Sequence, residues 1–189
     1  MKQYARPALI AGLIGLAGCA QSGTTYGPSD RMTQIDSYYI DGAAGRDIKL
    51  EVWGDPFQMP KDVFARTVEN DLKDAPLQDR EPTHPTLTPN SSAKPIYRVV
   101  YVFNSGSLTG NDICKVGDYK WNGPPPSRVQ ATAAFCVLNR AITEITGEVN
   151  ATSPSDVGFY RLTREMLADI FRPDVGRNMG PPPGAIRIN

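Results

Sequence analysis

The chain begins with a short apolar run that determines where the remainder has to fold. Residues 8–17 are ten consecutive positions without a charge, too few for a membrane span, which takes roughly 20 apolar residues. Lys2 and Arg6 precede the run and small residues end it, which is the pattern of a cleaved export signal. We therefore expect residues 1–18 to be removed and the rest to fold outside the cytoplasm as one domain.

The residues at the end of this run carry a second signal. Leu16, Ala17 and Gly18 directly precede Cys19, and these four residues resemble the lipobox of bacterial lipoproteins. The resemblance implies that Cys19 becomes the acylated first residue of the mature chain and anchors it to a membrane. Ala20 follows in place of an acidic residue, which is similar to the pattern that sends enterobacterial lipoproteins to the outer membrane.

Two cysteines remain once Cys19 carries lipid. Cys114 and Cys136 would lie in an oxidising compartment, where pairs of thiols persist as disulfides. We expect a disulfide between them, which for a loop of this length stabilises a domain by about 3 kcal/mol on the chain-entropy model. Two buried free thiols are the main alternative. A catalytic thiol is less favoured, because the sequence has no Cys-x-x-Cys spacing.

The charges give no indication of a nucleic-acid partner. The chain has 20 basic and 20 acidic residues, well mixed along its length, and loss of Lys2 and Arg6 with the signal leaves a slight net negative charge. Nucleic-acid binding depends on basic patches that this pattern lacks. A slightly acidic surface also gains little from anionic lipid, so membrane attachment is predicted to depend on several acyl chains at Cys19.

The folded part is predicted to start with two strands and a helix. Apolar residues alternate over 48–52, the two-residue period of a half-buried strand. Residues 38–40 are a candidate partner strand, and residues 41–45 supply the positive-φ positions of a hairpin loop. From 60 to 74 the apolar period becomes helical, with Pro60 tolerated in the first turn.

Three more strands and a second helix are predicted further along the chain. Residues 96–103 are rich in β-branched and aromatic side chains, as in a central strand. Two further strands are predicted over 128–138 and 141–149, with a tight turn at Asn139-Arg140 in which asparagine tolerates a left-handed conformation. A capping pattern opens the last helix, predicted over 154–171.

This order of elements predicts an α+β fold, with an antiparallel sheet of about five strands and two helices packed on one face, a two-layer sandwich. The domain is predicted over 34–172, between a flexible tether at 19–33 and a Pro- and Gly-rich flexible tail at 173–189. The layout is similar to that of small periplasmic and outer-membrane lipoproteins that act as assembly factors or accessory subunits. That similarity of layout implies an envelope protein as partner.

Few residues are suited to catalysis or to metal binding. His84, the single histidine, lies between prolines in a predicted loop and is expected at the surface. Zinc takes three or four ligands such as histidine and cysteine. Because two cysteines are expected in a disulfide, the single histidine does not provide enough ligands for a zinc site. The serines lack the Gly-x-Ser-x-Gly spacing of a nucleophile elbow. The sequence therefore predicts no catalytic residue, no metal site and no cofactor.

Four acidic residues keep one enzymatic alternative open. Glu51, Asp55, Glu144 and Glu148 lie in or beside predicted strands, and two of their carboxyl groups at a suitable separation would resemble a glycosidase pair. Acidic residues in strands more often belong to the solvated face of a sheet. We expect that role here.

Aromatic residues are the remaining candidates for a binding surface. Five of them are suited to a groove for sugar rings or peptide: Trp53, Tyr97, Tyr101, Tyr119 and Trp121. A place in the core or at its edge is the favoured interpretation for the set.

Two long loops are predicted at 76–95 and 104–127, and loops of this length in a compact domain are uncommon unless they are functional or disordered. Tyr119 and Trp121 lie in the second loop, and they are the predicted binding residues because aromatic anchors dominate interface energies.

The favoured function is that of a membrane-anchored envelope lipoprotein that binds or scaffolds other envelope components without catalysis, on the periplasmic face of the outer membrane. One alternative is a periplasmic enzyme acting on envelope polymer. Another is a carrier of a small or lipidic ligand, which requires a dry cavity between the helices and the sheet.

Overall fold

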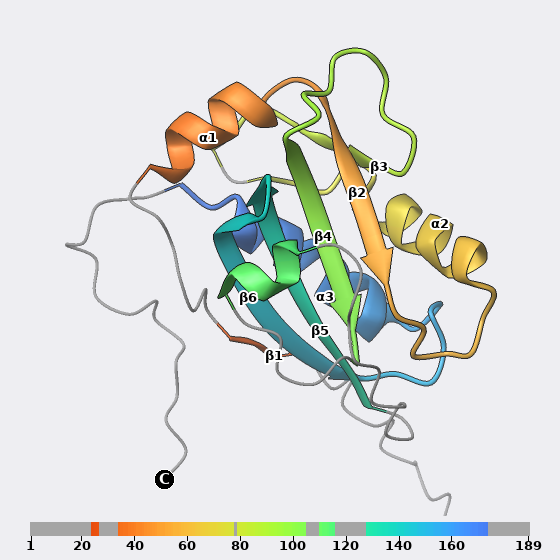
Figure 1. The fold of residues 1–189 in the computed structure, drawn as a ribbon. Coiled ribbons are helices and arrows are strands. Elements are labelled where there is room, and N and C mark those ends of the chain that lie inside the picture. Colours follow the sequence, from red (N-terminus) through yellow and green to blue (C-terminus); the bar gives the residue numbers. More distant parts are fainter. Residues whose placement is uncertain (1–23, 27–33, 78, 105–109, 116–127, 174–189) are drawn as a thin grey trace, which may run out of the picture.

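The computed structural model describes residues 24–26, 34–77, 79–104, 110–115 and 128–173. Within these residues the fold is α+β, as the sequence predicts, and is built on one six-stranded mixed sheet. The strands lie in the order β1-β6-β5-β4-β2-β3 (Figure 1).

Most elements lie close to their predicted positions. The strands are β1 (Thr24–Tyr26), β2 (Asp47–Trp53), β3 (His84–Thr86), β4 (Tyr97–Phe103), β5 (Arg128–Val137) and β6 (Arg140–Asn150). The helices are α1 (Ile35–Gly42), α2 (Lys61–Leu72) and α3 (Val157–Ile170), and η1 (Gly110–Cys114) is a short 3-10 helix. Four of the five predicted strands and both predicted helices are present.

The prediction of an antiparallel sheet is wrong at one side of the sheet. β4, β5 and β6 pair antiparallel, but β2 pairs in parallel with both β4 and β3. Parallel neighbours need a crossover connection, which is usually helical, and α2 lies between β2 and β3 in the chain. β3 has only three residues, within the predicted loop 76–95, so it carries no periodicity that a sequence pattern can detect.

The strand predicted at 38–40 and its hairpin loop at 41–45 are also wrong, because these residues contribute to a third helix. Ile35, Tyr39 and Gly42 form the buried side of α1, with a spacing that suits a helix and not a strand. Gly42 lies against the ring of Tyr97, where an added Cβ would come within 2.4 Å of a ring carbon. Glycine is therefore used here for close packing rather than for a turn.

The turn between β5 and β6 differs in one detail from the prediction. Val137 pairs with Arg140, so Leu138 and Asn139 form the turn. Leu138, with φ of 53°, occupies the left-handed region that was predicted for Asn139. The Leu138 N–H donates to the carbonyl oxygen of Ile96 at 2.8 Å, which fixes this turn beside the start of β4.

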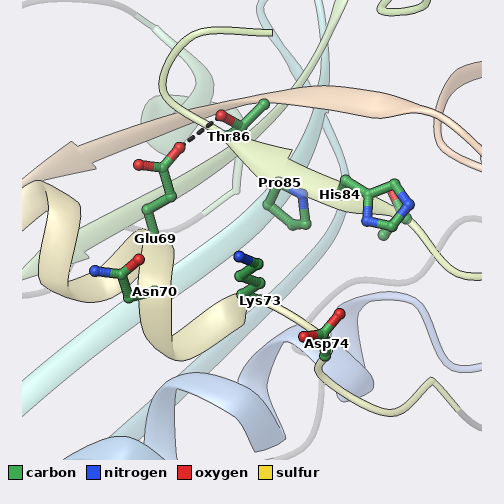
Figure 2. A pocket seen from close by; sticks show the side chains of 8 residues that line it. Glu69, Asn70, Lys73, Asp74, His84, Pro85 and Thr86 are labelled. Carbon is green, nitrogen blue, oxygen red and sulfur yellow. Dashed lines mark hydrogen bonds between the residues drawn. The ribbon is translucent and has the colours of Figure 1, made fainter.

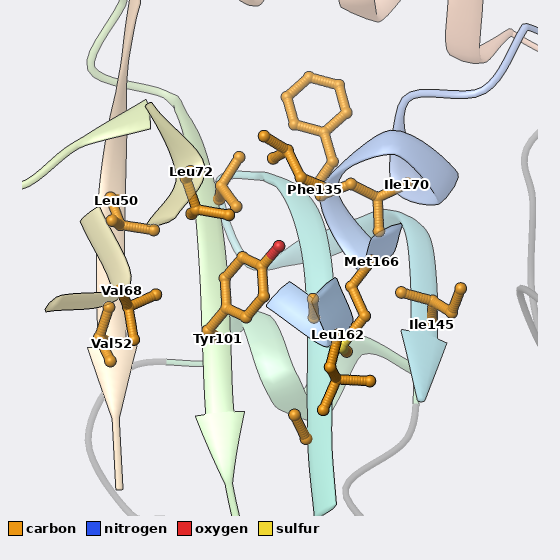
Figure 3. Close-up of a cluster of buried hydrophobic side chains, with 14 of the residues drawn as sticks. Leu50, Val52, Val68, Leu72, Tyr101, Phe135, Ile145, Leu162, Met166 and Ile170 are labelled. Atoms are coloured by element: carbon orange, nitrogen blue, oxygen red, sulfur yellow. The ribbon is translucent and has the colours of Figure 1, made fainter. Parts of the chain in front are cut away.

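The main core lies between one face of the sheet and the helices α2 and α3. Its members come from every layer, and Figure 3 shows side chains from β2, β4, β5, β6 and both helices meeting there. The hydroxyl of Tyr101, a fully buried residue, donates to the carbonyl oxygen of Thr163 in α3 at 2.8 Å. Phe171, just after α3, contacts Tyr39 of α1 at a ring-centroid distance of 5.0 Å, which joins the third helix to this core.

The other face of the sheet carries a smaller apolar cluster under η1. The cluster is Val100, Val102, Ile113, Cys114, Ala134 and Cys136. Cys114 and Cys136 form the predicted disulfide, with 5.7 Å between their Cα atoms. The predicted two-layer arrangement therefore gains a partial third layer over the face that the helices leave open.

Candidate functional site

The predicted binding residues Tyr119 and Trp121 lie outside the described residues, but the strand ends that flank their segment are well defined. Asn104 directly follows β4, with φ of 51°. Its N–H donates to the carbonyl oxygen of Gln130 at 2.8 Å, and its side-chain oxygen accepts the N–H of Gln130 at 2.9 Å. These two hydrogen bonds fix the point where the chain leaves the sheet.

η1 fixes the same segment at a second point, on the open face of the sheet. Besides the disulfide to β5, the carbonyl oxygen of Cys114 accepts a hydrogen bond from the Arg98 guanidinium. Asn111 accepts the N–H of Ala141 at 3.0 Å through its side-chain oxygen. The residues around Cys114 are thus held next to the β5–β6 turn.

Two of the aromatic candidates belong to the core, as favoured from the sequence. Tyr97 is 4 % exposed and Tyr101 is fully buried. Burial, followed by the hydrogen bond that its hydroxyl donates to Asp41 at 2.6 Å, raises the pKa of Tyr97 to about 12. Hydrogen bonds from Lys94 and Tyr97 in turn lower the pKa of Asp41. These tyrosines tie α1 and α3 to the sheet and offer no ring for a ligand.

Trp53 is only partly buried, and its ring faces a cation. The Lys61 ammonium lies 4.1 Å from the centre of the Trp53 ring. Contacts of this kind contribute about 0.5 to 1 kcal/mol at exposed sites. Trp53 therefore caps the edge of the small cluster and holds the start of α2.

Glu51, Glu144 and Glu148 do not come together as a glycosidase pair would, and Glu144, which is 1 % exposed, does not lie on the solvated face that was expected for it. Glu51 and Glu144 share one row of the sheet, but β4 and β5 lie between them, which separates their backbones by roughly 14 Å. Glu144 and Glu148 are four residues apart on β6, roughly 13 Å. Glycosidase carboxyl groups are roughly 5 to 9.5 Å apart. Glu51 instead pairs with Arg98 at 3.5 Å, and Glu148 pairs with Arg128.

An open pocket of about 350 Å³ lies between α2 and β3 (Figure 2). Its walls are Glu69, Asn70, Lys73, Asp74, Thr83, His84, Pro85 and Thr86. One oxygen of Glu69 accepts hydrogen bonds from the Thr86 hydroxyl at 2.5 Å and from the Leu87 N–H at 2.8 Å. Glu69 therefore fastens β3 to the helix, and its position is already explained by the fold.

The titratable side chains at this pocket are of mixed charge. His84 is exposed, as predicted, although it lies in β3 rather than in a loop. Lys73 is also exposed and shares the rim with acidic residues, so the charges are mixed. Among the residues that the structure describes, no three His, Cys, Asp or Glu side chains are grouped to hold a metal ion.

Exposed large apolar side chains gather at the two opposite ends of the sheet. At the end where β5 turns into β6, here called the hairpin end, Ile40, Ile96 and Leu138 are 66, 42 and 60 % exposed. At the end where β6 finishes, here called the Asn150 end, the exposed residues are Val63, Val157 and Tyr160. The exposure of these two groups could not be predicted from sequence periodicity. A periodic pattern identifies apolar residues, but it does not show which of them are covered by other parts of the fold.

No helix within the described ranges is both long enough and apolar enough to cross a membrane. Comparison of the chain with protein-family models, with curated proteins and with solved structures finds no match. The arrangement of its residues is therefore the basis on which a function can be proposed.

Proposed function

We propose that this chain is an envelope lipoprotein, anchored through lipid at Cys19, whose folded domain binds a protein partner through the hairpin end of its sheet. The observation that carries the proposal is the group of exposed apolar side chains there, Ile40, Ile96 and Leu138. Clustered apolar exposure on an otherwise soluble surface is typical of protein-binding sites.

Leu138 is the most informative residue of this group. A left-handed conformation costs a non-glycine residue about 1 to 2 kcal/mol, and glycine or asparagine is the usual occupant of such a turn position. Here the position holds a large apolar residue that is 60 % exposed. Backbone strain and an exposed apolar side chain at one place favour a binding role over a structural one.

The three residues belong to segments that meet at the start of β4. Ile96 accepts the backbone hydrogen bond of Leu138, and Asp41, next to Ile40 in α1, contacts both Lys94 and Tyr97. A partner surface of modest size can therefore contact all three.

The interior of the domain supports a surface binder over a ligand carrier. Leu162 and Met166 of α3 have no exposed surface, and they fill the space between that helix and the sheet (Figure 3). Recognition by Tyr119 and Trp121 stays a prediction, because both residues lie outside the part of the chain that the structure describes.

Photo-crosslinking in the native envelope tests the proposal. A photoreactive amino acid at Ile40 should capture a defined envelope protein, because this side chain belongs to the proposed surface and is 66 % exposed. The substitution Leu138→Asp should abolish that crosslink, since it places a charge in an apolar contact. Arg66→Asp, at an exposed position of α2, is the control that should leave it intact. An unchanged crosslink in a folded Leu138→Asp protein would place the binding surface elsewhere.

A further inference from the structure

We infer that the domain rests with the Asn150 end of its sheet against the lipid surface, where Val63, Val157 and Tyr160 contact the bilayer. This inference rests on the lipid anchor of the proposed function and adds to it an orientation and a contact surface. It leaves the hairpin end directed away from the membrane.

The chain reaches β1 from the Asn150 end of the sheet. β1 pairs antiparallel with β6, with Thr24 opposite Glu148 and Tyr26 opposite Thr146. Glu148 is two residues from the end of β6, so continuing β1 backward along the chain leads past the Asn150 end of the sheet. Figure 1 shows β1 beside β6 at this end.

Only a short length of chain separates β1 from the proposed lipid anchor. Thr24 follows Cys19 by five residues, which span about 18 Å at most when fully extended. Without β1 the chain from Cys19 to residue 34 would reach about 50 Å. The pairing of β1 therefore converts a long tether into a short one.

The short tether decides between the two apolar ends. From Glu148 to Arg140, β6 runs for eight residues away from the anchor, which is about 27 Å. That distance exceeds the 18 Å that the tether can span, whereas the Asn150 end lies only two residues beyond Thr24. The membrane that holds Cys19 is thus next to the Asn150 end.

The Asn150 end presents exposed apolar side chains from two helices. α2 follows β2 and α3 follows β6, so both helices start at the Asn150 end (Figure 1). Val63 and Val157 lie in their first turns, 42 and 62 % exposed, and Tyr160 is 41 % exposed one turn further into α3. Tyrosine is enriched where membranes meet water. Exposed apolar groups beside a lipid anchor have the bilayer interface as their nearest apolar partner.

Amide hydrogen exchange of the lipidated full chain tests this orientation. The protein is placed in nanodiscs of phosphatidylethanolamine and phosphatidylglycerol and compared with the soluble Cys19→Ser protein. We expect amides of residues 152–160 to exchange several-fold more slowly in the nanodisc, and those of residues 138–141 to exchange equally. Inserting about 20 Gly and Ser residues between Cys19 and Thr24 should abolish the protection while lipidation persists.

A pair of matched variants isolates the apolar contact. Val157→Asp adds one negative charge at the Asn150 end and should reduce the protection, whereas Asn139→Asp adds the same charge in the exposed turn and should not. Mass spectrometry shows whether the chain carries lipid, so a failure of the proposed anchor can be distinguished from a failure of the proposed orientation. A chain without lipid would overturn the anchor itself, whereas a lipidated chain protected at residues 138–141, or nowhere, would overturn only the orientation.

Discussion

In the proposed function, Leu138 serves binding at a cost to stability, because its backbone has φ of 53° and its side chain is 60 % exposed. Replacing it by glycine removes the left-handed strain, so we expect the free energy of unfolding to rise by about 1 kcal/mol while crosslinking to the partner weakens. Urea denaturation measures the first effect and photo-crosslinking the second. Asn139→Gly, at the neighbouring turn position, is the control and should leave the crosslink unchanged. A Leu138→Gly protein that is less stable than the parent would contradict the assignment of strain.

Asp71, near the end of α2, gives the domain a pH dependence. Burial raises the pKa of its carboxyl group from 3.8 to about 6, and the Arg164 guanidinium opposes this only in part. Within the described residues, its Oδ2 atom has no hydrogen-bond partner. Because the folded state holds this proton more tightly than the unfolded state, stability should fall as pH rises from about 4 to about 6.

The substitution Asp71→Asn tests that sign. The neutral side chain should flatten the fall in stability across this window and make the protein more stable at pH 7. The gain is about 1 kcal/mol once solvent screening of this half-buried group is allowed for. Chemical denaturation at several pH values measures it. An Asp71→Asn protein with the same pH profile as the parent would show that another group is responsible.

At the scale of elements, α3 contributes most to the main core. Leu167 is 1 % exposed, and its replacement by alanine should lower the free energy of unfolding by about 2 to 5 kcal/mol through lost burial and a residual cavity. Val157→Ala in the same helix removes a mostly exposed side chain and should change stability by no more than about 0.5 kcal/mol. Similar losses in the two variants, measured by urea denaturation, would mean that α3 packs only loosely.

The disulfide has a separate effect on η1 and β5. Cys114 and Cys136 are 22 residues apart, and a closed loop of that size restricts the unfolded chain by about 3 kcal/mol. We expect the double substitution Cys114→Ala and Cys136→Ala to lower the unfolding free energy by about that amount. Adding reductant to the double variant should have no further effect. A loss below about 0.5 kcal/mol would show that the loop is already restricted without the bond.

Elements with a clear period were predictable from sequence, and elements defined by distant contacts were not. β4 and α3 carry their apolar patterns over 7 and 14 residues, long enough for the period to be read. α1 was mistaken for a strand because Tyr38, Tyr39 and Ile40 favour strands locally. These residues form a helix because the ring of Tyr39 packs against the ring of Phe171, which is more than a hundred residues away in the chain.

For the candidate site, too, one feature was predictable from the sequence and another was not. The disulfide followed from compartment and cysteine count alone, and the structure confirms it. The exposed apolar ends did not follow, because their exposure depends on how α1 and the β5–β6 turn meet the start of β4. The sequence does not state that Leu138, rather than Asn139, takes the left-handed position.

For the molecule as a whole, the anchor and the fold should be separable. Cys19 precedes all the described elements, so Cys19→Ser should release the protein from the membrane and leave the cooperativity of unfolding of its domain unchanged. Partition between detergent and aqueous phases measures the release from the membrane, and thermal unfolding measures the cooperativity. Ala20→Ser, which leaves the cysteine in place, is the control and should still partition into detergent. Equal detergent partitioning of wild type and Cys19→Ser would contradict lipidation at this cysteine.

Pro85 has a consequence for many copies of this protein on one membrane. The proposed anchor would confine copies to two dimensions, where exposed sheet edges meet often and can join into fibrils. β3 forms one edge, and the His84 N–H points inward to the carbonyl oxygen of Arg46 in the chain leading into β2. Backbone groups alternate along a strand, so the next nitrogen, that of Pro85, faces outward and carries no hydrogen to donate. A neighbouring copy therefore finds no regular ladder of backbone donors at the β3 edge of the sheet.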